Sequence, residues 1–371
     1  MTFDSSLLKK EEEAVFRLRE LYGTYGYSQY KMNKFEEYDL YVRNKSFLIS
    51  DSVITFTDTN GKLLALKPDV TLSIVKNSKD IPGQVQKVYY NENVYRISGK
   101  SQAYKEIMQV GLECLGDIDA YCIGEVLSLA CQSLGVIADD YILDVSHLGL
   151  LSMILDRIGI SEKSRRALLD CVAHKNTHEA SLICQAEGID PKRASLLDGL
   201  TDCSGEANTA FQKLYALQAD AEWQDAVRAF EETVEHLPLS HLRIDFSVIN
   251  DLRYYNGIVF QGYVAGVPER ILSGGQYDNL MHRMDKKSGA IGFAIYLDRL
   301  EYLSTSHQKY DVDALLLYDL SVPAARIGDA VKELTEQGLR VTAQKSIPEK
   351  LKYRQLLRIT ESGVETLETN A

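Results

Sequence analysis

The residue pattern of this chain changes twice between strand-like and helical, and this limits the folds that it can adopt. From about residue 49 to 116, short alternating apolar runs are separated by turn residues. Residues 147–238 instead have long helical periodicities with few strand-like runs. Strand patterns then return at LRIDFSV and YYNGIVFQGYVAG. This order predicts an α+β fold with an all-helical insertion at about 147–238.

The first strand-rich stretch contains one hairpin signal. Asn60 and Gly61 stand between the apolar runs VITFTD and LLALK. An Asn-Gly pair in this setting favours a tight turn because both residues tolerate positive φ angles. The later runs VQKVYY and EIMQVGLECLG are interpreted as two further strands.

Helical periodicity is present near both ends of the large domain. Apolar residues between 6 and 22 fall on one stripe, which predicts an amphipathic helix that Gly23 and Gly26 end. Residues 291–303, which follow a glycine turn, are predicted to form a core helix.

The end of the chain has a separate pattern. After Tyr310, the run DALLLYDL, a helix near 324–337 and the run LRVTAQ predict one short βαβ-like unit. We therefore expect two domains, at residues 1–305 and 306–371.

Composition indicates a globular chain with a large core. At 371 residues, 45% of them hydrophobic and 25% charged, the chain is long enough for two or three domains. The sequence has no N-terminal targeting pattern and no run near the roughly 20 apolar residues of a membrane span. We expect a cytoplasmic protein without membrane contact. The net charge of −12 argues against a nucleic-acid partner, because such binding depends on lysines and arginines that displace counterions.

The six cysteines do not form a metal-binding pattern. They stand at 114, 122, 131, 171, 184 and 203, without a CxxC pair and within apolar or helical runs. Buried thiols in a reducing compartment are the expected state. We expect no metal and no cofactor.

Residues 106–116 alternate between apolar and polar side chains. Gln109, Gly111 and Glu113 therefore share one face of a predicted strand. The polar face could lie in water, as in many antiparallel sheets. The gap that Gly111 leaves between two polar groups would equally form a slot for a small ligand.

Two further segments contain candidate site residues. LKPDVT, residues 66–71, is predicted to lead from a strand through a proline into a helix, where Asp69 could act as the helix cap. Tyr254 and Tyr255 are predicted to open a strand, where paired aromatic residues usually belong to the core.

In order and spacing, these segments resemble the catalytic domain of histidyl-tRNA synthetase over roughly the first 305 residues. LRYYNGIVF, SGGQYDNL and GFAIYLDRL, at 252–260, 273–280 and 292–300, extend the match. The resemblance implies a class II synthetase-like antiparallel sheet flanked by helices. It also implies a histidine-binding pocket, formed by Asp69, Thr71, Gln109, Glu113, Tyr254, Tyr255 and Tyr277. In that family the first two positions hold the amino acid's ammonium group, as a carboxylate can through charge-assisted hydrogen bonds.

Several charged residues that the family uses for adenylation are replaced. Asn250 stands where the family has an arginine before its tyrosine pair. The phosphate-binding segment keeps Arg96 only with a loop one residue shorter, and its glutamate becomes Ser98. Gln276 replaces the arginine of G-G-R-Y-D, whereas Arg299 stands where the family's last ATP-contacting arginine would be. Because each preorganised charge contributes about 3 to 4 kcal/mol to such a reaction, we expect no adenylation.

A synthetase-like chain without this chemistry, and with only the first part of an anticodon-binding domain, resembles the regulatory subunits of ATP phosphoribosyltransferase. That resemblance implies a non-catalytic partner of the short-form catalytic subunit, which performs the first step of histidine biosynthesis. It also implies histidine as a feedback effector.

Two other functions stay open from the sequence. One is an active histidyl-tRNA synthetase, and the other is a different amino acid-activating paralogue. The opening helix and the strands after it resemble the segment that pairs class II synthetase cores, so we expect a homodimeric core within a hetero-oligomer.

Overall fold

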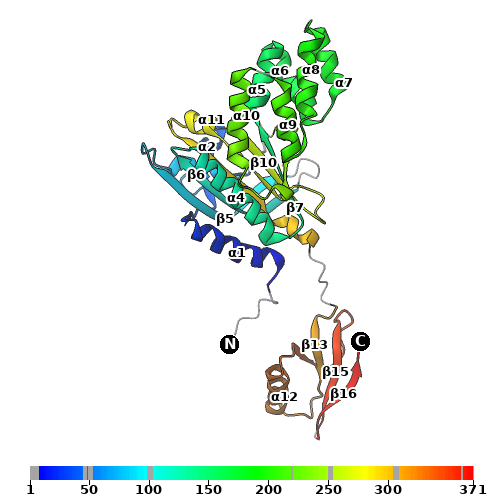
Figure 1. Cartoon of the computed structure of the whole chain (residues 1–371). Helices are drawn as coiled ribbons and strands as arrows, with labels where there is room; N and C mark the ends of the chain where they lie inside the picture. Colours follow the sequence, from blue (N-terminus) through cyan, green and yellow to red (C-terminus); the bar gives the residue numbers. More distant parts are fainter. Residues whose placement is uncertain are drawn as a thin grey trace. The chain divides into compact units, whose positions relative to one another are not determined.

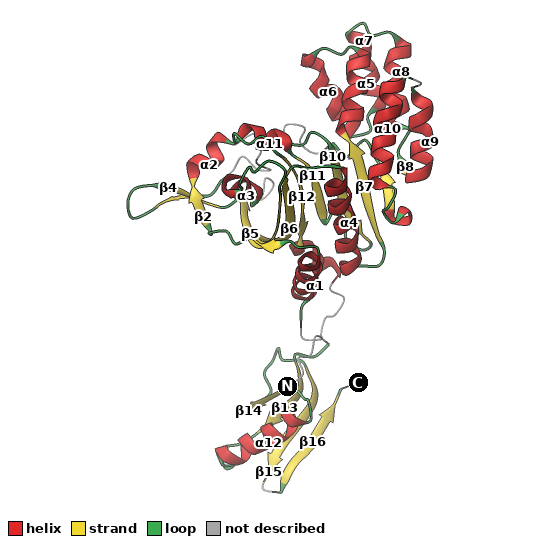
Figure 2. Cartoon of the chain, turned by 60° about the vertical axis from the view of Figure 1, so that its left-hand side comes forward, coloured by secondary structure: helices red, strands yellow, loops and turns green. Residues whose placement is uncertain are grey.

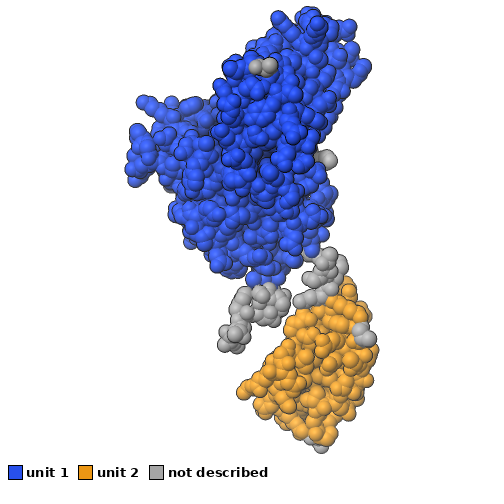
Figure 3. All heavy atoms as spheres, in the orientation of Figure 1, with its two compact units in different colours: residues 1–303 blue, residues 304–371 orange. Residues whose placement is uncertain are grey.

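The computed structural model describes residues 8–44, 48, 53–97, 103–218, 220–249, 254–303, 309–360 and 362–370. The chain forms two compact units, residues 1–303 and 304–371 (Figure 3). The first unit contains two apolar cores, and the second unit contains one of its own.

A nine-stranded sheet forms the centre of the first unit (Figure 1). In spatial order its strands are β1 (Ser28–Gln29), β5 (Val85–Ile97), β6 (Tyr104–Gly116), β12 (Gly289–Tyr296), β11 (Leu272–Gln276), β10 (Ile258–Val264), β7 (Tyr141–His147), β9 (Leu242–Ile244) and β8 (Gly205–Glu206). Only β1 with β5 and β7 with β9 pair in parallel; the other neighbours are antiparallel. The predicted α+β class is confirmed.

Helices cover one face of this sheet (Figure 2). They are α1 (Lys10–Thr24), α4 (Ala120–Ile137) and the 3₁₀ segment η4 (Leu297–Leu303). A side chain added at Gly262 of β10 would meet Leu134 of α4, so Gly262 faces this helix layer. The predicted opening helix is present, but it continues through Gly23 to Thr24. Among the described residues, α4 alone is long and apolar enough to cross a membrane; its buried side chains belong to the core.

The predicted helical insertion is a group of packed helices beside β7 (Figure 1). It comprises α5 (Leu148–Ile158), α6 (Glu162–Ala173), α7 (Thr177–Ala186), α8 (Pro191–Thr201), α9 (Ala207–Leu217), α10 (Ala221–Val234) and the short η3 (Leu239–His241). Ser161, Asn176, Asp190 and Asp220 cap four of these helices through their side chains. The segment is not purely helical, because β8 joins the edge of the central sheet.

A small three-stranded sheet lies before β5 in the sequence. Its order is β2 (Phe35–Glu37), β4 (Leu63–Leu66) and β3 (Thr55–Thr57), with α2 (Tyr38–Arg43) and α3 (Thr71–Asn77) beside it. The predicted Asn60-Gly61 hairpin is confirmed, since β3 and β4 are antiparallel and Gly61 has a φ of 80°.

The predicted core helix at 291–303 is wrong. Residues 289–296 form β12, which pairs with β6 and β11, and only 297–303 are helical. The run GAIGFAIY is apolar at nearly every position, so it has no period that separates strand from helix. A strand between two others, with both faces covered, requires this continuous pattern. The short α11 (Asp278–Arg283) follows β11.

The second unit is a four-stranded sheet with one helix. The strand order is β14 (Val341–Gln344), β13 (Val312–Leu317), β15 (Tyr353–Thr360) and β16 (Gly363–Thr369), and α12 (Ala324–Glu336) connects β13 to β14. Because β13 and β14 are parallel, the predicted βαβ-like unit is confirmed. The antiparallel pair of β15 and β16 was not predicted.

Candidate functional site

One cavity of about 640 Å³ lies on the sheet face opposite α4. Its floor follows a row of paired residues from four neighbouring strands, because direct partners in a ladder point to the same face. From β12 to β7 the row is Ala294, Ser273, Gln261 and Asp144. Gly111 of β6 continues the row, but the side chain of Tyr90 covers it, so the predicted gap at Gly111 is filled. The predicted polar face of β6 therefore lies over this cavity, and Gln109 and Glu113 are buried beside it rather than in water.

The cavity brings together the residues that the sequence analysis assigned to histidine. Asp69, Thr71, Gln109, Glu113, Tyr254, Tyr255 and Tyr277 all contribute to its lining, as does Arg96. Segments more than 180 residues apart in the sequence thus meet at one place.

Glu113 is the most constrained of these side chains. It is 2% exposed, and its two oxygens accept hydrogen bonds from Thr71 Oγ1 and from the Tyr277 hydroxyl, each at 2.7 Å. Burial raises the pKa of Glu113 to about 8, and these two hydrogen bonds only partly oppose that shift. A carboxyl group held in this way can pair with a cationic or hydrogen-bonding ligand.

Asp69 serves as a helix cap and also lines the cavity. Its Oδ1 accepts a hydrogen bond from the backbone N–H of Leu72 at 3.0 Å, in the first turn of α3. Burial raises the pKa of Asp69, although the nearby Arg96 opposes the shift. Both interpretations from the sequence are therefore compatible with its position.

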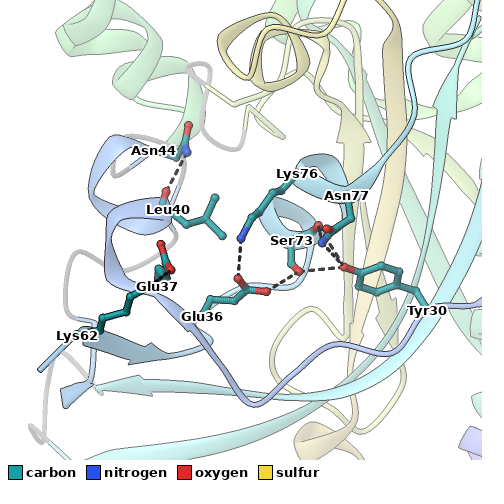
Figure 4. Close-up of polar contacts among 9 residues, drawn as sticks. All are labelled: Tyr30, Glu36, Glu37, Leu40, Asn44, Lys62, Ser73, Lys76 and Asn77. Atoms are coloured by element: carbon teal, nitrogen blue, oxygen red, sulfur yellow. Dashed lines mark hydrogen bonds and ion pairs between the residues drawn. The ribbon is translucent and has the colours of Figure 1, made fainter. Parts of the chain in front are cut away.

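A polar network fixes α3 in place (Figure 4). The Tyr30 hydroxyl hydrogen-bonds Ser73 Oγ at 3.0 Å and accepts from Asn77 at 2.9 Å. Glu36 of β2 accepts from Ser73 at 3.3 Å and pairs with Lys76 at 2.9 Å. Since Asp69 and Thr71 stand at the beginning of α3, this network positions them as well.

The tyrosines form one wall of the cavity. The ring of Tyr254 lies 4.6 Å from that of Tyr255 and 5.5 Å from that of Tyr277, measured between centroids. A side chain at Gly275 would meet Tyr255, so only glycine leaves room for that ring. The tyrosine pair does not open a strand as predicted, because β10 begins at Ile258.

The two candidate ATP-site arginines differ in position. Arg96 lines the cavity, and its Nε donates to the carbonyl oxygen of Pro68 at 3.1 Å. Arg299 is not in the cavity lining. Its guanidinium pairs with Glu269 at 3.0 Å, stacks 4.6 Å from the Tyr296 ring centroid and hydrogen-bonds the Arg270 carbonyl.

The inference drawn from Gln276 is corrected. Side chains alternate along β11, so Gly275 and Gln276 point to opposite faces of the sheet. Gln276 Oε1 accepts from the backbone N–H of Ile258 at 2.8 Å, and its side chain is absent from the cavity lining. The replacement of the family's arginine by Gln276 is therefore not evidence that a phosphate site in this cavity has been lost. Ser98 and Asn250 lie outside the described residues.

The far end of the cavity contains residues that the sequence analysis missed. Asp144, Asp245, Gln261, Tyr263 and Arg270 line it. Burial and the neighbouring Asp245 raise the pKa of Asp144 to about 6. The Lys175 ammonium group donates to Oδ2 of Asp245 at 2.8 Å, and the Ser247 hydroxyl donates to Oδ1 at 2.7 Å. No motif marks these positions, but the alternation along LDVSH could have placed Asp144 on a sheet face.

The described residues contain no group of three or more His, Cys, Asp or Glu side chains suited to a metal ion. All six cysteines are buried and unpaired by disulfides, as predicted.

A family model described as Histidyl-tRNA synthetase matches residues 4–300. The chain belongs to the histidyl-tRNA synthetase family. This confirms the family resemblance that the motifs predict.

The similar proteins have two different names, ATP phosphoribosyltransferase regulatory subunit and histidine–tRNA ligase. An ATP phosphoribosyltransferase regulatory subunit of Oceanobacillus iheyensis is 26% identical over 311 residues, which cover 82% of this chain and 76% of the relative. A histidine–tRNA ligase of Methanocaldococcus jannaschii is 27% identical over 302 residues, which cover 79% and 71%. Because the two identities are nearly equal, sequence identity alone does not distinguish a regulatory subunit from a histidine–tRNA ligase.

Solved structures confirm the synthetase-like fold. An ATP phosphoribosyltransferase regulatory subunit/histidyl-tRNA synthetase from Bacillus halodurans has a TM-score of 0.73 at 22% identity, covering 92% of this chain and 91% of its own. A chain of the ATP phosphoribosyl transferase (HisG:HisZ) complex from Thermotoga maritima has a TM-score of 0.60 at 20% identity, covering 80% and 98%.

Proposed function

We propose that this chain is a non-catalytic regulatory subunit of ATP phosphoribosyltransferase, required by the short-form catalytic subunit in the first step of histidine biosynthesis. One observation carries the proposal. In the described cavity lining, acidic side chains outnumber arginines: Asp69, Asp144, Asp245 and Glu113, whose raised pKa keeps it largely protonated near pH 7, stand against Arg96 and Arg270.

This balance of charge suits a small amino acid better than a nucleoside triphosphate. The ammonium group of histidine needs a carboxylate, and its imidazole needs a polar partner between flat walls. Charge that develops on a phosphate needs fixed cations instead. Arg299, the family's candidate for that role, is already paired with Glu269 outside the lining. Asn250 and Ser98 supply no charge at two further positions.

We propose that histidine occupies the end of the cavity formed by Asp69, Thr71, Gln109, Glu113 and the three tyrosines, and acts there as a feedback inhibitor. A coupling of about 1 to 3 kcal/mol between this site and the catalytic subunit would give the usual 5- to 150-fold regulation. The names of the relatives support the partner, and the geometry supports the effector.

We further propose a homodimeric core that carries the catalytic subunits outside it. Light scattering at micromolar concentration, alone and with the partner, tests this arrangement. A monomer in both samples would contradict it.

The decisive experiment is reconstitution. The chain is purified with a short-form catalytic subunit, and ATP phosphoribosyltransferase activity is measured with and without histidine. We expect activity only in the complex, and inhibition that Glu113→Ala relieves while basal activity stays. Unchanged histidine binding by calorimetry in both Glu113→Ala and Asp69→Ala would place the sensing site elsewhere.

An active histidyl-tRNA synthetase is the alternative function. The family match supports it, and the ligase relative is about as similar to this chain as the regulatory subunit is. Histidine-dependent pyrophosphate exchange separates the two functions. We expect none above background, and no charging of tRNA.

A further inference from the structure

A second cavity, of about 730 Å³, lies on the opposite face of the central sheet from the first. His147 of β7 and Ile258 of β10, which are paired in the sheet, form its floor. Gln276 of β11 extends this floor, since its side-chain oxygen accepts a hydrogen bond from the backbone N–H of Ile258. The N-terminal half of α4 and the C-terminal half of α10 form its walls.

The floor presents two hydrogen-bond donors. His147 Nδ1 accepts from the backbone N–H of Leu150 at 3.2 Å, so a neutral ring carries its proton on Nε2. Burial lowers the pKa of His147 to about 4, which keeps the ring neutral near pH 7. Gln276 uses Oε1 for Ile258, which leaves its amide NH₂ for another partner. Among the described residues, neither His147 Nε2 nor Gln276 Nε2 has a protein acceptor.

The spacing of these donors limits what can bind. One strand separates His147 from Gln276, so their backbones are about 10 Å apart, and the apolar Ile258 lies between them. A flat molecule that rests on Ile258 would need acceptors on two opposite edges. Heteroaromatic bases with ring nitrogens on both edges have this form.

The walls and rim limit the ligand further. Tyr25 and Tyr121, both exposed, offer ring faces at the opening. Glu232 and Asp119 stand exposed at the rim, where carboxylates accept from hydroxyl groups and repel anions. A phosphate group is therefore disfavoured at this end of the cavity.

We propose that this second cavity binds an uncharged nucleoside, with its base on Ile258 between His147 and Gln276 and its sugar hydroxyls toward the carboxylate rim. The site is separate from the proposed histidine pocket and does not depend on the proposed function. Nevertheless, Gln276 directly precedes Tyr277, which binds Glu113, so the two cavities share the end of β11.

Calorimetry of the full chain with adenosine tests the proposal. We expect saturable binding of one adenosine per chain, and weaker binding of adenosine monophosphate because of the acidic rim. Ala229→Trp places a large side chain in the cavity from an exposed position of α10 and should weaken adenosine binding at least tenfold. Ala221→Trp, at an exposed position of the same helix outside the lining, is the control and should leave it within twofold.

A second variant pair tests the donors. Gln276→Glu keeps the acceptor for Ile258 but removes the amide donor, and His147→Asn keeps a helix-capping acceptor but removes Nε2. Both should weaken adenosine binding and leave histidine binding unchanged. Absence of saturable adenosine binding, competition by histidine, or equal effects of Ala229→Trp and Ala221→Trp would overturn the proposal. Competition by histidine would place adenosine in the first cavity instead.

Discussion

Tyr277 donates a hydrogen bond to Glu113 Oε2 at 2.7 Å, although 164 positions separate the two residues in the sequence. Both side chains are buried, at 2% exposure each. The register of β6, β12 and β11 makes the contact possible, because Glu113, Gly292 and Gly275 are paired across the three strands. Gly292 leaves the space that the Glu113 carboxyl group occupies, and Gly275 leaves room for the neighbouring ring of Tyr255.

This buried carboxyl group should make stability depend on pH. The folded protein holds the Glu113 proton up to about pH 8, whereas the unfolded chain releases it near its ordinary value of 4.5. Folding stability should therefore fall as the pH rises through this window, with a slope of at most about 1.4 kcal/mol per pH unit from this group. Urea denaturation at several pH values would measure it.

Glu113→Gln is the matched variant for this measurement. A glutamine cannot ionise, so the difference in unfolding free energy between variant and parent should grow in the variant's favour from pH 5 to pH 8. Asp144 titrates in both proteins and cancels in that difference, whereas Asp69, whose charge acts on Glu113, is part of the measured effect. Parallel stability curves would show that Glu113 has an ordinary pKa.

The alternation of side chains along strands predicts much of the site. The wrong predictions, at Gln276 and in β12, also concern the periodicity of side chains along a strand. The alternation of 107–114 put Gln109 and Glu113 on one face, where the structure has them. The same alternation along SGGQY predicts Gln276 on the opposite face from Gly275, whereas the family motif predicts a phosphate contact there. The β12 strand was missed because an apolar run without a period does not show which neighbours cover it.

Long-range partners could not be predicted from the local sequence. Asp144 and Arg270 have no motif around them, and Asp144 reaches the cavity because β7 pairs with β10, which places it beside Gln261. The pairing of Arg299 with Glu269 also depends on the packing of separate elements. Register and packing, which no local pattern contains, determine which residues meet.

Asp69→Asn should weaken histidine binding by about 10- to 150-fold, which corresponds to a lost hydrogen bond to a charged group of about 1.5 to 3 kcal/mol. Asparagine still caps α3 through its side-chain oxygen, so the fold should be unaffected. Asp58→Asn is the control, because Asp58 accepts similar backbone bonds in the exposed hairpin turn. Calorimetry at pH 7 would decide, and equal affinities in the two variants would place the ammonium group elsewhere.

Gly292→Ala should both destabilise the protein and abolish histidine binding. A Cβ atom at Gly292 would overlap Glu113 Oε2 and approach the Leu112 carbonyl, so the carboxyl group must move. Overpacking of this kind costs about 1 to 3 kcal/mol.

Gly135→Ala is the matched glycine-to-alanine control, for which we expect the opposite result. Gly135 lies in α4, and an added Cβ would make ordinary contact with Tyr141 at 3.6 Å. Alanine favours a helix over glycine by about 1 kcal/mol, so this variant should be more stable and bind histidine normally. Thermal melts and calorimetry compare the pair. A stable Gly292→Ala variant with normal binding would mean that Glu113 does not contact the ligand.

Tyr30→Phe should loosen α3 and thereby reduce histidine affinity without touching the ligand. The lost hydroxyl removes the bonds to Ser73 and Asn77, at a cost of about 1 kcal/mol for a typical hydrogen bond. Lys62→Met is the control in the same region (Figure 4). Lys62 and Glu37 are 65% and 61% exposed, and ion pairs exposed to this extent contribute little to stability because water and salt screen them. Denaturant melts should rank Tyr30→Phe below Lys62→Met, and calorimetry should find weaker histidine binding only in Tyr30→Phe. If both variants bind histidine like the parent, the network beside α3 supports the fold but does not position Asp69 and Thr71.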